Sequence, residues 1–427
     1  MDENNEFAAV AIRDDQLVPW PRVAAVGAMV AFSLPTFVTG LEVGAGLNPI
    51  NTFWALLWGS LIIVVIGAIM GAIGTKTRMS SYLLVRIAFG DIGAGFVNIA
   101  FAISLLGWFG VNINLFMDAV SGLGRDVWNI TFPPAALAVF ASFCMTVTTL
   151  IGFKAINILA SALVPVLAVV TFLLAKSALS AQSAIDIFEA DPVQTLTVGE
   201  GISAIVGAII IGAIILPDIT RFVRHWRGAV YTAVMSYFVV QLSVMGAAAL
   251  AGAASGKSDI LEIMLDLNLG IGAFIIVIAG SWVLNSLNLY SAVLGTKATF
   301  PKLKTVSLTI GLGVIGVVAA LMNILDSFIT FLFYLSVIFI PVAGVLIIDA
   351  LAIRPNVYEI ETLDNNRALN WKGFVAWALG AIFAVLASEG LIPTLTNIAA
   401  MDAVILSGML YTVLAWNERA AQKVNPL

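Results

Sequence analysis

The chain from Arg22 to Val43 reads RVAAVGAMVAFSLPTFVTGLEV. This stretch is apolar over about the 20 residues that cross a bilayer as a helix, yet Pro35 stands near its centre and Gly40 follows. Because proline has no amide hydrogen, backbone groups around it lose their helical partners inside the membrane. Such backbone is tolerated only where it is buried in protein or lines a cavity. The stretch therefore predicts an interrupted membrane helix beside a cavity.

A second apolar stretch, 201–219, is interrupted in a similar way by Gly207, Gly212 and Pro217. The two stretches are five predicted helices apart, and a repeat with an odd number of helices places its second copy upside down relative to the first. Paired interruptions at matching positions are typical of transporters built from inverted repeats, whose binding site lies near the middle of the membrane. The alternative is that Gly and Pro are simply common in membrane helices.

The composition excludes several classes of protein. Of the 427 residues, 61% are apolar and 11% are charged, whereas soluble domains are about 45 to 50% apolar and about 25% charged. We therefore predict a membrane protein. A single cysteine, Cys144, and a single histidine, His225, leave no internal disulfide and no histidine-rich metal site. We expect no metal, no cofactor and, because there is no long basic run, no nucleic-acid partner.

Apolar blocks along the chain predict an all-α integral membrane protein with twelve transmembrane helices. They form two inverted repeats of five helices, at 22–180 and 201–350, followed by two additional helices at 371–416. Tails at 1–21 and 417–427 complete the chain. The predicted spans are 22–43, 53–74, 92–118, 133–153, 155–180, 201–219, 229–253, 269–294, 306–322, 328–350, 371–387 and 397–416.

The basic residues predict the orientation of these helices. If the N-terminus lies in the cytoplasm, 17 Lys and Arg residues fall in cytoplasmic segments, and only Arg125, Lys176 and Lys257 fall on the other side. Cytoplasmic loops of membrane proteins carry an excess of Lys and Arg. We therefore predict a multi-pass protein of the cell membrane with both termini in the cytoplasm.

Polar side chains in two apolar helices are candidates for ligand contacts. Trp108 and Asn112 lie one helical turn apart, and an indole beside an amide can hold a flat polar ring by stacking on its face and bonding to its edge. Asn285 and Asn288 have the spacing i, i+3. Amides in hydrocarbon need a partner, which can be a ligand, an ion or another helix. The alternative is a packed tryptophan whose neighbouring amides bind adjacent helices.

Carboxylates within or near the predicted spans are few. Glu42 lies in the outer half of the first span with no basic residue near it in sequence. It is a candidate to carry a proton, and the alternative is a hydrated carboxylate at the external mouth. Asp218 precedes Arg221 by three residues and Asp349 precedes Arg354 by five. We predict that both are structural pairs at the cytoplasmic side.

Short motifs in a fixed order carry a family resemblance from about residue 36 to residue 371. They are Thr39-Gly40 with Gly44-Ala45-Gly46-Leu47, Gly74-Thr75-Lys76-Thr77, Gly107-Trp108-Phe109-Gly110, Pro217-Asp218 with Arg221-Phe222, Trp282 with Asn285, Ile340-Pro341 with Gly344, and Asn370-Trp371. Together they resemble the nucleobase-cation symporter family, of the purine and cytosine permease type. The resemblance implies twelve helices, ten of them in a five-plus-five inverted repeat. It also implies a purine, a pyrimidine or a related flat heterocycle as substrate.

The resemblance also implies roles for particular residues. By position, Trp108 is similar to the stacking residue of the family and Asn285 to the amide of its site, and unwound backbone is expected near Ser33–Thr36 and Gly207–Ile209. The predicted substrate-binding residues are Ser33, Thr36, Trp108, Asn112, Gly207, Ala208, Ile209 and Asn285. The candidate residues for the coupling ion are Glu42 and Asn288.

The chain departs from the family pattern at several site positions. Leu105 and the pair Ala208-Ile209 stand where cytosine permeases have Gln and Ser-Phe. Either Asn112 replaces the lost amide, or the substrate is less polar or larger than cytosine. Val283 and Leu284 replace the two hydroxyl residues of sodium-coupled members, and a bare sodium ion needs about five or six oxygen ligands. We therefore predict proton coupling or facilitated diffusion rather than sodium coupling.

These observations predict a secondary transporter that imports a nucleobase-like heterocycle by alternating access, in which the first, second, sixth and seventh helices move against the rest. Two alternatives stay open. One is a membrane sensor that keeps the site but transports nothing, and the other is a sodium-independent carrier of another heterocycle, an amino acid or an amine. We expect no enzyme, because the sequence contains neither a metal-ligand cluster nor a nucleophile-base motif.

Overall fold

The structure is a computed structural model, and nearly all of its regular structure is helical. Among the residues that the structure describes, seven helices are long and apolar enough to cross a membrane, and α1 with α2 makes an eighth if this bent pair is one span. The β-type pairing in the described residues is a single bridge between Val18 and Val223. The structure describes residues 11–189, 194–322, 339–396 and 398–424.

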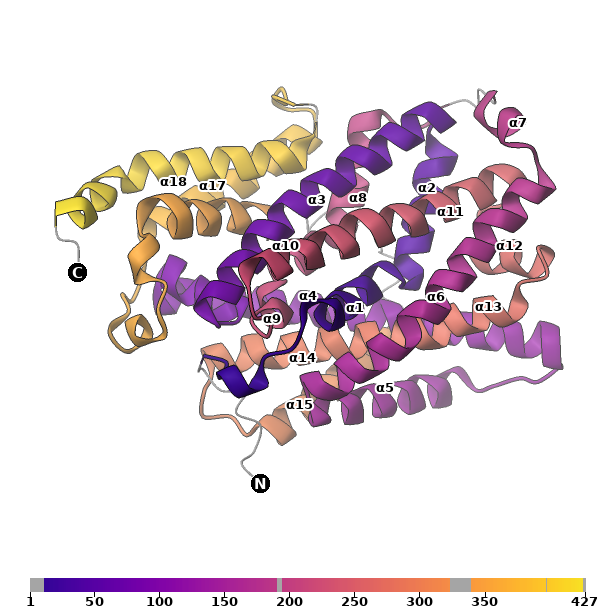
Figure 1. The fold of residues 1–427 in the computed structure, drawn as a ribbon, viewed down its shortest axis with the longest axis horizontal. Coiled ribbons are helices and arrows are strands. Elements are labelled where there is room, and N and C mark those ends of the chain that lie inside the picture. Colours follow the sequence, from indigo (N-terminus) through magenta and orange to yellow (C-terminus); the bar gives the residue numbers. More distant parts are fainter. Residues whose placement is uncertain (1–10, 190–193, 323–338, 397, 425–427) are drawn as a thin grey trace.

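The helices follow the predicted spans, and Figure 1 labels most of them along the chain. Their bounds are α1 Trp20–Ala31, α2 Leu34–Gly46, α3 Pro49–Thr77, α4 Ser81–Trp128, α5 Pro134–Ile151, α6 Phe153–Ala181, α7 Ala184–Glu189, α8 Val198–Ile214, α9 Pro217–Thr220, α10 Trp226–Ala233, α11 Gln241–Ser255, α12 Ile260–Asp266, α13 Gly270–Ile275, α14 Ser281–Thr299, α15 Thr305–Leu321, α17 Trp371–Ser388 and α18 Ala399–Val424.

Two π-helical segments, Val234–Val240 and Ile276–Gly280, join α10 to α11 and α13 to α14. The predicted span at 328–350 lies partly outside the described residues, and its described end belongs to a short apolar helix, Phe339–Ile353. The total of twelve membrane helices and the inverted repeat therefore stay predictions, as does the orientation of the termini.

The first predicted interruption is confirmed. Helices α1 and α2 meet at a bend of 54°, and Phe32 and Ser33 lie between them. Pro35 stands in the first turn of α2, where a helix needs no internal bond to the missing amide. The carbonyl of Val30, at the end of α1, accepts hydrogen bonds from the Ser33 hydroxyl at 2.7 Å and from the Thr36 hydroxyl at 3.1 Å. Side chains thus satisfy the backbone group that the bend exposes.

The second interruption lies further along the chain than predicted. Helix α8 continues through Gly207–Ile209, so the prediction of unwound backbone there was wrong. The break comes at Ile215 and Leu216, directly before Pro217. The physical reason is that glycine keeps its amide and can stay in a packed helix, whereas proline has no amide to bond to the carbonyl four residues back. That carbonyl, of Ala213, accepts instead from the amide of Leu216 at 3.4 Å.

Helix α4 is longer than the predicted span at 92–118 and bends at Gly90. The glycine has φ +76°, a left-handed conformation that side chains rarely adopt. A Cβ atom here would lie 2.7 Å from the carbonyl oxygen of Arg367. The amides of Asp91 and Ile92 donate to the carbonyls of Arg367 and Ala368, at 3.0 and 2.8 Å. The loop before α17 therefore completes the hydrogen bonding of the bent helix.

A buried charge cluster fastens the end of the Phe339–Ile353 helix to α18. The Asp349 carboxylate accepts hydrogen bonds from Arg354 at 2.8 Å, from the Tyr358 hydroxyl at 2.7 Å and from the Tyr411 hydroxyl at 2.6 Å. The predicted pairing of Asp349 with Arg354 is confirmed. Arg354 also donates to the carbonyl of Ile87 in α4, at 2.9 Å, so the cluster reaches the long helix as well.

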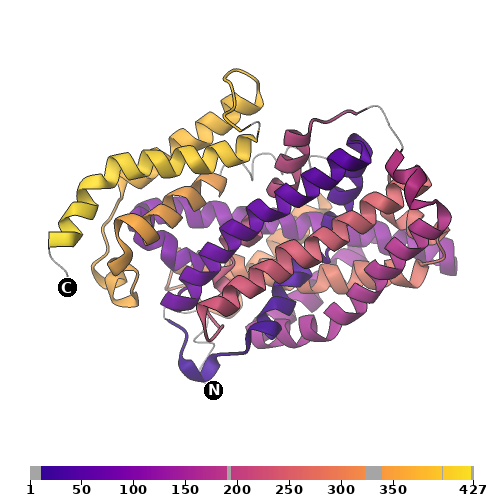
Figure 2. The ribbon, with the colours of Figure 1, turned by 45° about the horizontal axis from the view of Figure 1, so that its top comes forward.

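Glu418 extends these contacts at the end of α18. Its carboxylate lies 2.9 Å from the Lys372 ammonium and 3.3 Å from the Arg367 guanidinium. Burial opposes ionisation of Glu418, but these two cations outweigh it and lower the pKa of the carboxyl. In both Figure 1 and Figure 2, α17 and α18 lie together at one side of the bundle.

Helix α2 packs against α11 at a very short distance, and glycine makes this possible. A Cβ atom at Gly40 would lie 2.6 Å from the backbone of Met245, and one at Gly44 would lie 2.8 Å from the side chain of Ala249. Small residues at such contacts let helix backbones approach each other within a membrane. Gly246, on the same helix as Met245, differs from both, because a Cβ atom there would have no other atom within 4 Å.

We expect Gly40→Ala to destabilise the protein, because the methyl group must push α2 away from α11. Overpacking typically costs about 1 to 3 kcal/mol, which a lowered Tm of the detergent-solubilised protein would reveal. The matched control is Gly246→Ala, which places its methyl group in open space and should leave the Tm unchanged or slightly raised. Equal Tm values for the two variants would contradict the close contact.

Candidate functional site

A cavity lies beside both helix interruptions. It is lined by residues of α1, α2, α4, α8, α9 and α14, of the π-helical segment Val234–Val240, and of the turns that follow α1 and α8. Most of the lining is apolar. The polar or aromatic side chains that line it are Ser33, Thr36, Trp108, Asp218, Tyr237, Asn288 and Ser291.

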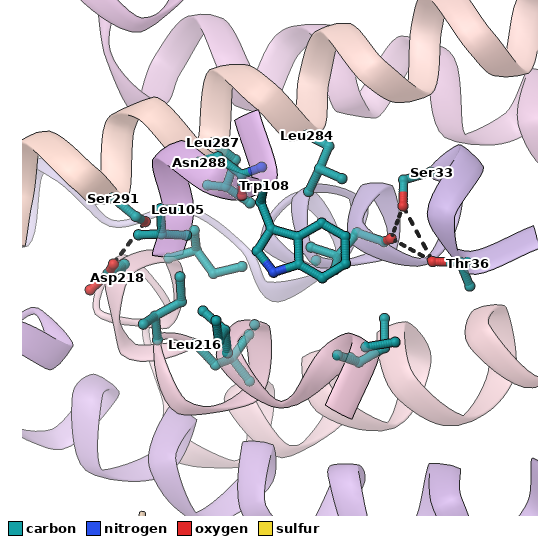
Figure 3. Close-up of a pocket in the computed structure, with 18 of the residues that line it drawn as sticks. Ser33, Thr36, Leu105, Trp108, Leu216, Asp218, Leu284, Leu287, Asn288 and Ser291 are labelled. Atoms are coloured by element: carbon teal, nitrogen blue, oxygen red, sulfur yellow. Dashed lines mark hydrogen bonds between the residues drawn. The ribbon is translucent and has the colours of Figure 1, made fainter. Parts of the chain in front are cut away.

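Trp108 occupies the middle of this cavity. Figure 3 shows its indole between the Ser33 and Thr36 hydroxyls on one side and Asp218 with Ser291 on the other. The side chain is 8% exposed, which is consistent with a ring shielded from the surroundings of the protein. An indole face at this position can stack on a flat ring. The structure thus brings Trp108, Ser33 and Thr36 together, as the sequence predicted.

The two hydroxyls of the first interruption use their hydrogens on the backbone. Both Ser33 and Thr36 donate to the Val30 carbonyl, and their oxygens lie 3.2 Å apart. A hydroxyl that donates its one hydrogen keeps lone pairs to accept with. Toward the cavity these groups are therefore acceptors, suited to an N–H group on the edge of a ligand.

The two amides of α14 differ in position from the prediction, which put Asn285 in the substrate site and Asn288 at the coupling ion. Asn288 lines the cavity, and its amide nitrogen donates to the carbonyl oxygen of Asn285 at 3.3 Å. Asn285 lies behind it, fully buried, and donates to the backbone carbonyl of Phe109 at 3.1 Å. Asn285 thus orients Asn288 and ties α14 to α4, while Asn288 presents the polar group to the cavity.

Three other predicted site residues do not line the cavity. The Asn112 amide turns back along its own helix and donates to the carbonyl of Trp108 at 2.8 Å. Gly207 is absent from the lining although its neighbours Ala208 and Ile209 belong to it. Glu42, the candidate proton carrier, has an exposed side chain elsewhere on α2. The amide that Leu105 lacks is therefore not replaced by Asn112.

Sequence reasoning missed Asp218 and Ser291 as cavity residues. Arg221 does contact Asp218, but its Nε donates to the backbone carbonyl, at 3.1 Å, and one terminal nitrogen donates to the Tyr290 hydroxyl at 2.7 Å. The Asp218 side chain instead faces the cavity. A signal for Ser291 was present in the sequence, because it continues the spacing of Asn285 and Asn288 by three more residues along one helical face.

The described residues contain no cluster of three His, Cys, Asp or Glu side chains that could hold a metal ion. The cavity combines an aromatic ring, hydroxyl acceptors and an amide with a largely apolar wall. Such a combination of apolar lining and few polar groups is typical of small-molecule sites.

The profile of one protein family matches residues 24–410, which is most of the chain. That family is described as permease for cytosine/purines, uracil, thiamine, allantoin. The chain belongs to this permease family. The cytosine permease of Escherichia coli (strain K12) is 30% identical to this chain over 344 residues, which are 80% of each of the two. The permease is accordingly a membrane transporter and not an enzyme.

Solved structures share the fold of the permease. Mhp1, a nucleobase-cation-symport-1 family transporter in a closed conformation with bromovinylhydantoin bound, has a TM-score of 0.79 at 18% identity, over 99% of this chain and 96% of Mhp1. An inward-facing conformation of Mhp1 has a TM-score of 0.73 at 18% identity, over 97% and 95% of the two chains. A Na+-coupled sialic acid symporter in an outward-open state has a TM-score of 0.67 at 14% identity, over 97% and 93%.

Proposed function

We propose that the permease imports a nucleobase or a closely related flat heterocycle, cytosine-like or purine-like, by alternating access. The observation that carries this proposal is the Trp108 indole inside a cavity, beside the bend between α1 and α2 and the short break between α8 and α9. An indole provides a flat stacking surface that a planar base can cover, while the surrounding polar groups bond to its edge. The similarity to a cytosine permease and the heterocycle bound in Mhp1 support the same substrate class.

The edge contacts of the proposed substrate come from few groups. Ser33 and Thr36 offer acceptors on one side of the indole, and Asn288 offers an amide. Leu105, Ala208 and Ile209 add only apolar surface. A site reads a polar edge strongly only where it supplies matching hydrogen-bonding groups. We therefore propose a substrate with fewer bonded edge groups than cytosine needs, or a larger ring such as a purine.

We propose that a proton, rather than sodium, couples to transport. Val283 is fully buried and Leu284 lines the cavity, so the two positions after Trp282 supply no side-chain oxygen. Sodium is a hard cation that prefers oxygen ligands. In this proposal the first, second, sixth and seventh helices move against the rest, and both termini lie in the cytoplasm of the cell that takes up the substrate.

Uptake into proteoliposomes tests the proposed function. We expect a labelled panel of cytosine, uracil, adenine, guanine and hypoxanthine to include at least one base that accumulates under an inward proton gradient, with no further gain from sodium. If no base accumulates under either gradient, the proposal that the permease transports nucleobases is wrong. Binding of a base without any flux would instead indicate a sensor, and uptake of amines alone would indicate an amine carrier.

Trp108→Ala should weaken binding of the transported base, because the stacking surface is lost. Stacking of a base on an aromatic side chain contributes about 1 to 3 kcal/mol, which corresponds to about 5- to 150-fold in Kd, measured by isothermal titration. The control is Trp282→Ala, since the Trp282 indole donates to the Thr148 hydroxyl at 2.9 Å and does not line the cavity. Equal losses in both variants would place the site elsewhere.

Asn288→Leu should also weaken binding, because an apolar side chain of similar size cannot bond to the edge of the substrate. Leaving a hydrogen-bonding group of the substrate unpaired costs about 1 to 3 kcal/mol, which would appear as an increase in the Kd of the base. Asn112→Leu is the matched control, since its amide bonds only within its own helix among the described contacts. A larger effect from Asn112 than from Asn288 would contradict the observed arrangement of the amides.

A further inference from the structure

Of the described residues that line the cavity, Asp218 is the one with a carboxylate, and the other ionisable side chain is that of Tyr237. It lies in α9, directly after the second interruption, and is only 1% exposed. We propose that the Asp218 carboxylate is the group that binds the coupling proton. In its ionised form it ties α9 to α4 and α14, and on protonation it releases them. This inference rests on the proposed function and names the residue through which the proton acts.

The ionised carboxylate is held by three donors from two other helices. One oxygen accepts from the Ser81 hydroxyl at 2.6 Å and from the Ser81 amide at 3.0 Å. The other accepts from the Ser291 hydroxyl at 2.8 Å. Ser81 begins α4 and Ser291 belongs to α14. Ser291 therefore lies on a helix that stays fixed in the proposed cycle, whereas Asp218 lies in the sixth span, which moves. Ser81 lies in the part of α4 that precedes its bend at Gly90.

Protonation changes what this carboxylate can bond to. An ionised carboxylate only accepts hydrogen bonds, whereas a protonated one carries a hydrogen of its own on one oxygen. That oxygen can no longer accept from a serine as before, and the remaining bonds lose the strength that the charge gave them. A proton that arrives through the cavity and binds Asp218 thus weakens the tie. When the proton leaves to the cytoplasm, the carboxylate ionises and the tie forms again.

The charged and titratable groups around Asp218 fit this role. Arg221 supplies a positive charge nearby, while its Nε bonds to the backbone of Asp218 and its terminal nitrogen bonds to the Tyr290 hydroxyl. Tyr82 of α4 also interacts electrostatically with Asp218. A buried carboxylate is tolerated in a membrane when a cation and donors compensate it. Because Arg221 binds the backbone, it can keep its place when the side chain of Asp218 is neutral.

The location distinguishes Asp218 from the other candidate carboxylate. Glu42 has an exposed side chain and does not line the cavity, so a proton on Glu42 has no direct contact through which to act on the cavity. Asp218 touches the cavity and two helices at once. Protonation at this position can therefore couple the occupancy of the cavity to the movement of α9.

The test uses the full chain in proteoliposomes with a transported base. For one proton per substrate, a gradient of one pH unit drives about 10-fold accumulation. Asp218→Asn should reduce this accumulation about 10-fold, to equilibrium, and abolish base-driven proton movement reported by an internal pH dye. Exchange of labelled for unlabelled base without a gradient should persist and become independent of pH. Glu42→Gln should retain both the accumulation and its pH profile.

Ser291→Ala supplies a second readout that does not depend on the folding of the Asp218 variant. Removing a donor to the ionised form favours the protonated form, so the pH at half-maximal uptake should rise by about one unit. Asp218→Glu, which keeps a titratable carboxyl, should restore proton-driven accumulation in part. A purely structural role for Asp218 predicts lower activity in these variants with an unchanged pH midpoint.

Several outcomes would overturn the inference while leaving the proposed function intact. One is accumulation of the base by Asp218→Asn with the wild-type pH profile, and another is loss of proton coupling in Glu42→Gln instead. The others are an unchanged pH at half-maximal uptake in Ser291→Ala, or wild-type uptake that does not depend on the proton gradient. If the wild-type protein moves no base under any gradient, the proposed function itself has failed, and the inference fails with it.

Discussion

The permease depends on one constraint: a backbone polar group inside hydrocarbon must find a partner within the protein. Helices α1 and α2 meet at a bend of 54°, a short break separates α8 from α9 within one span, and each of these sites exposes such groups. At the first, the hydroxyls of Ser33 and Thr36 bond to the Val30 carbonyl. At the second, the Leu216 amide bonds to the Ala213 carbonyl. The cavity lies beside both, and the hydroxyls that satisfy the first break also line it.

Few polar groups of the cavity wall are free to bond to a ligand, because most already have partners within the protein. The hydroxyls of Ser33 and Thr36 donate to the backbone and can only accept from a ligand, and the Asp218 carboxylate is already bonded to two serines. Few hydrogen-bonding groups therefore remain for a highly polar solute. In the proposed function the Trp108 indole supplies the stacking surface, so we expect shape and stacking to contribute more to recognition than a dense pattern of hydrogen bonds.

The sequence predicted the helices and the first break well, because the effects of long apolar blocks and of Pro35 depend only on residues that are close in the chain. It also singled out Trp108, from an indole beside an amide in an apolar helix and from the family resemblance, and this residue does line the cavity. It failed where the outcome depends on three-dimensional packing. Glycine at 207 permits a break but does not require one, whereas Pro217 removes an amide outright. The choice between Asn285 and Asn288 depends on the rotation of one helix against α4, and the direction of the Asp218 side chain depends on serines 137 and 73 residues away.

The bend of α4 at Gly90 has a mechanical meaning. Its freed amides bond to the carbonyls of Arg367 and Ala368, in the loop that leads into α17. If α4 became straight, the carbonyls of this loop would therefore lose their hydrogen bonds. The loop is also bound to α18 by the ion pair between Arg367 and Glu418. The last two helices thus brace α4, the helix that carries Trp108, through the loop that contacts its bend.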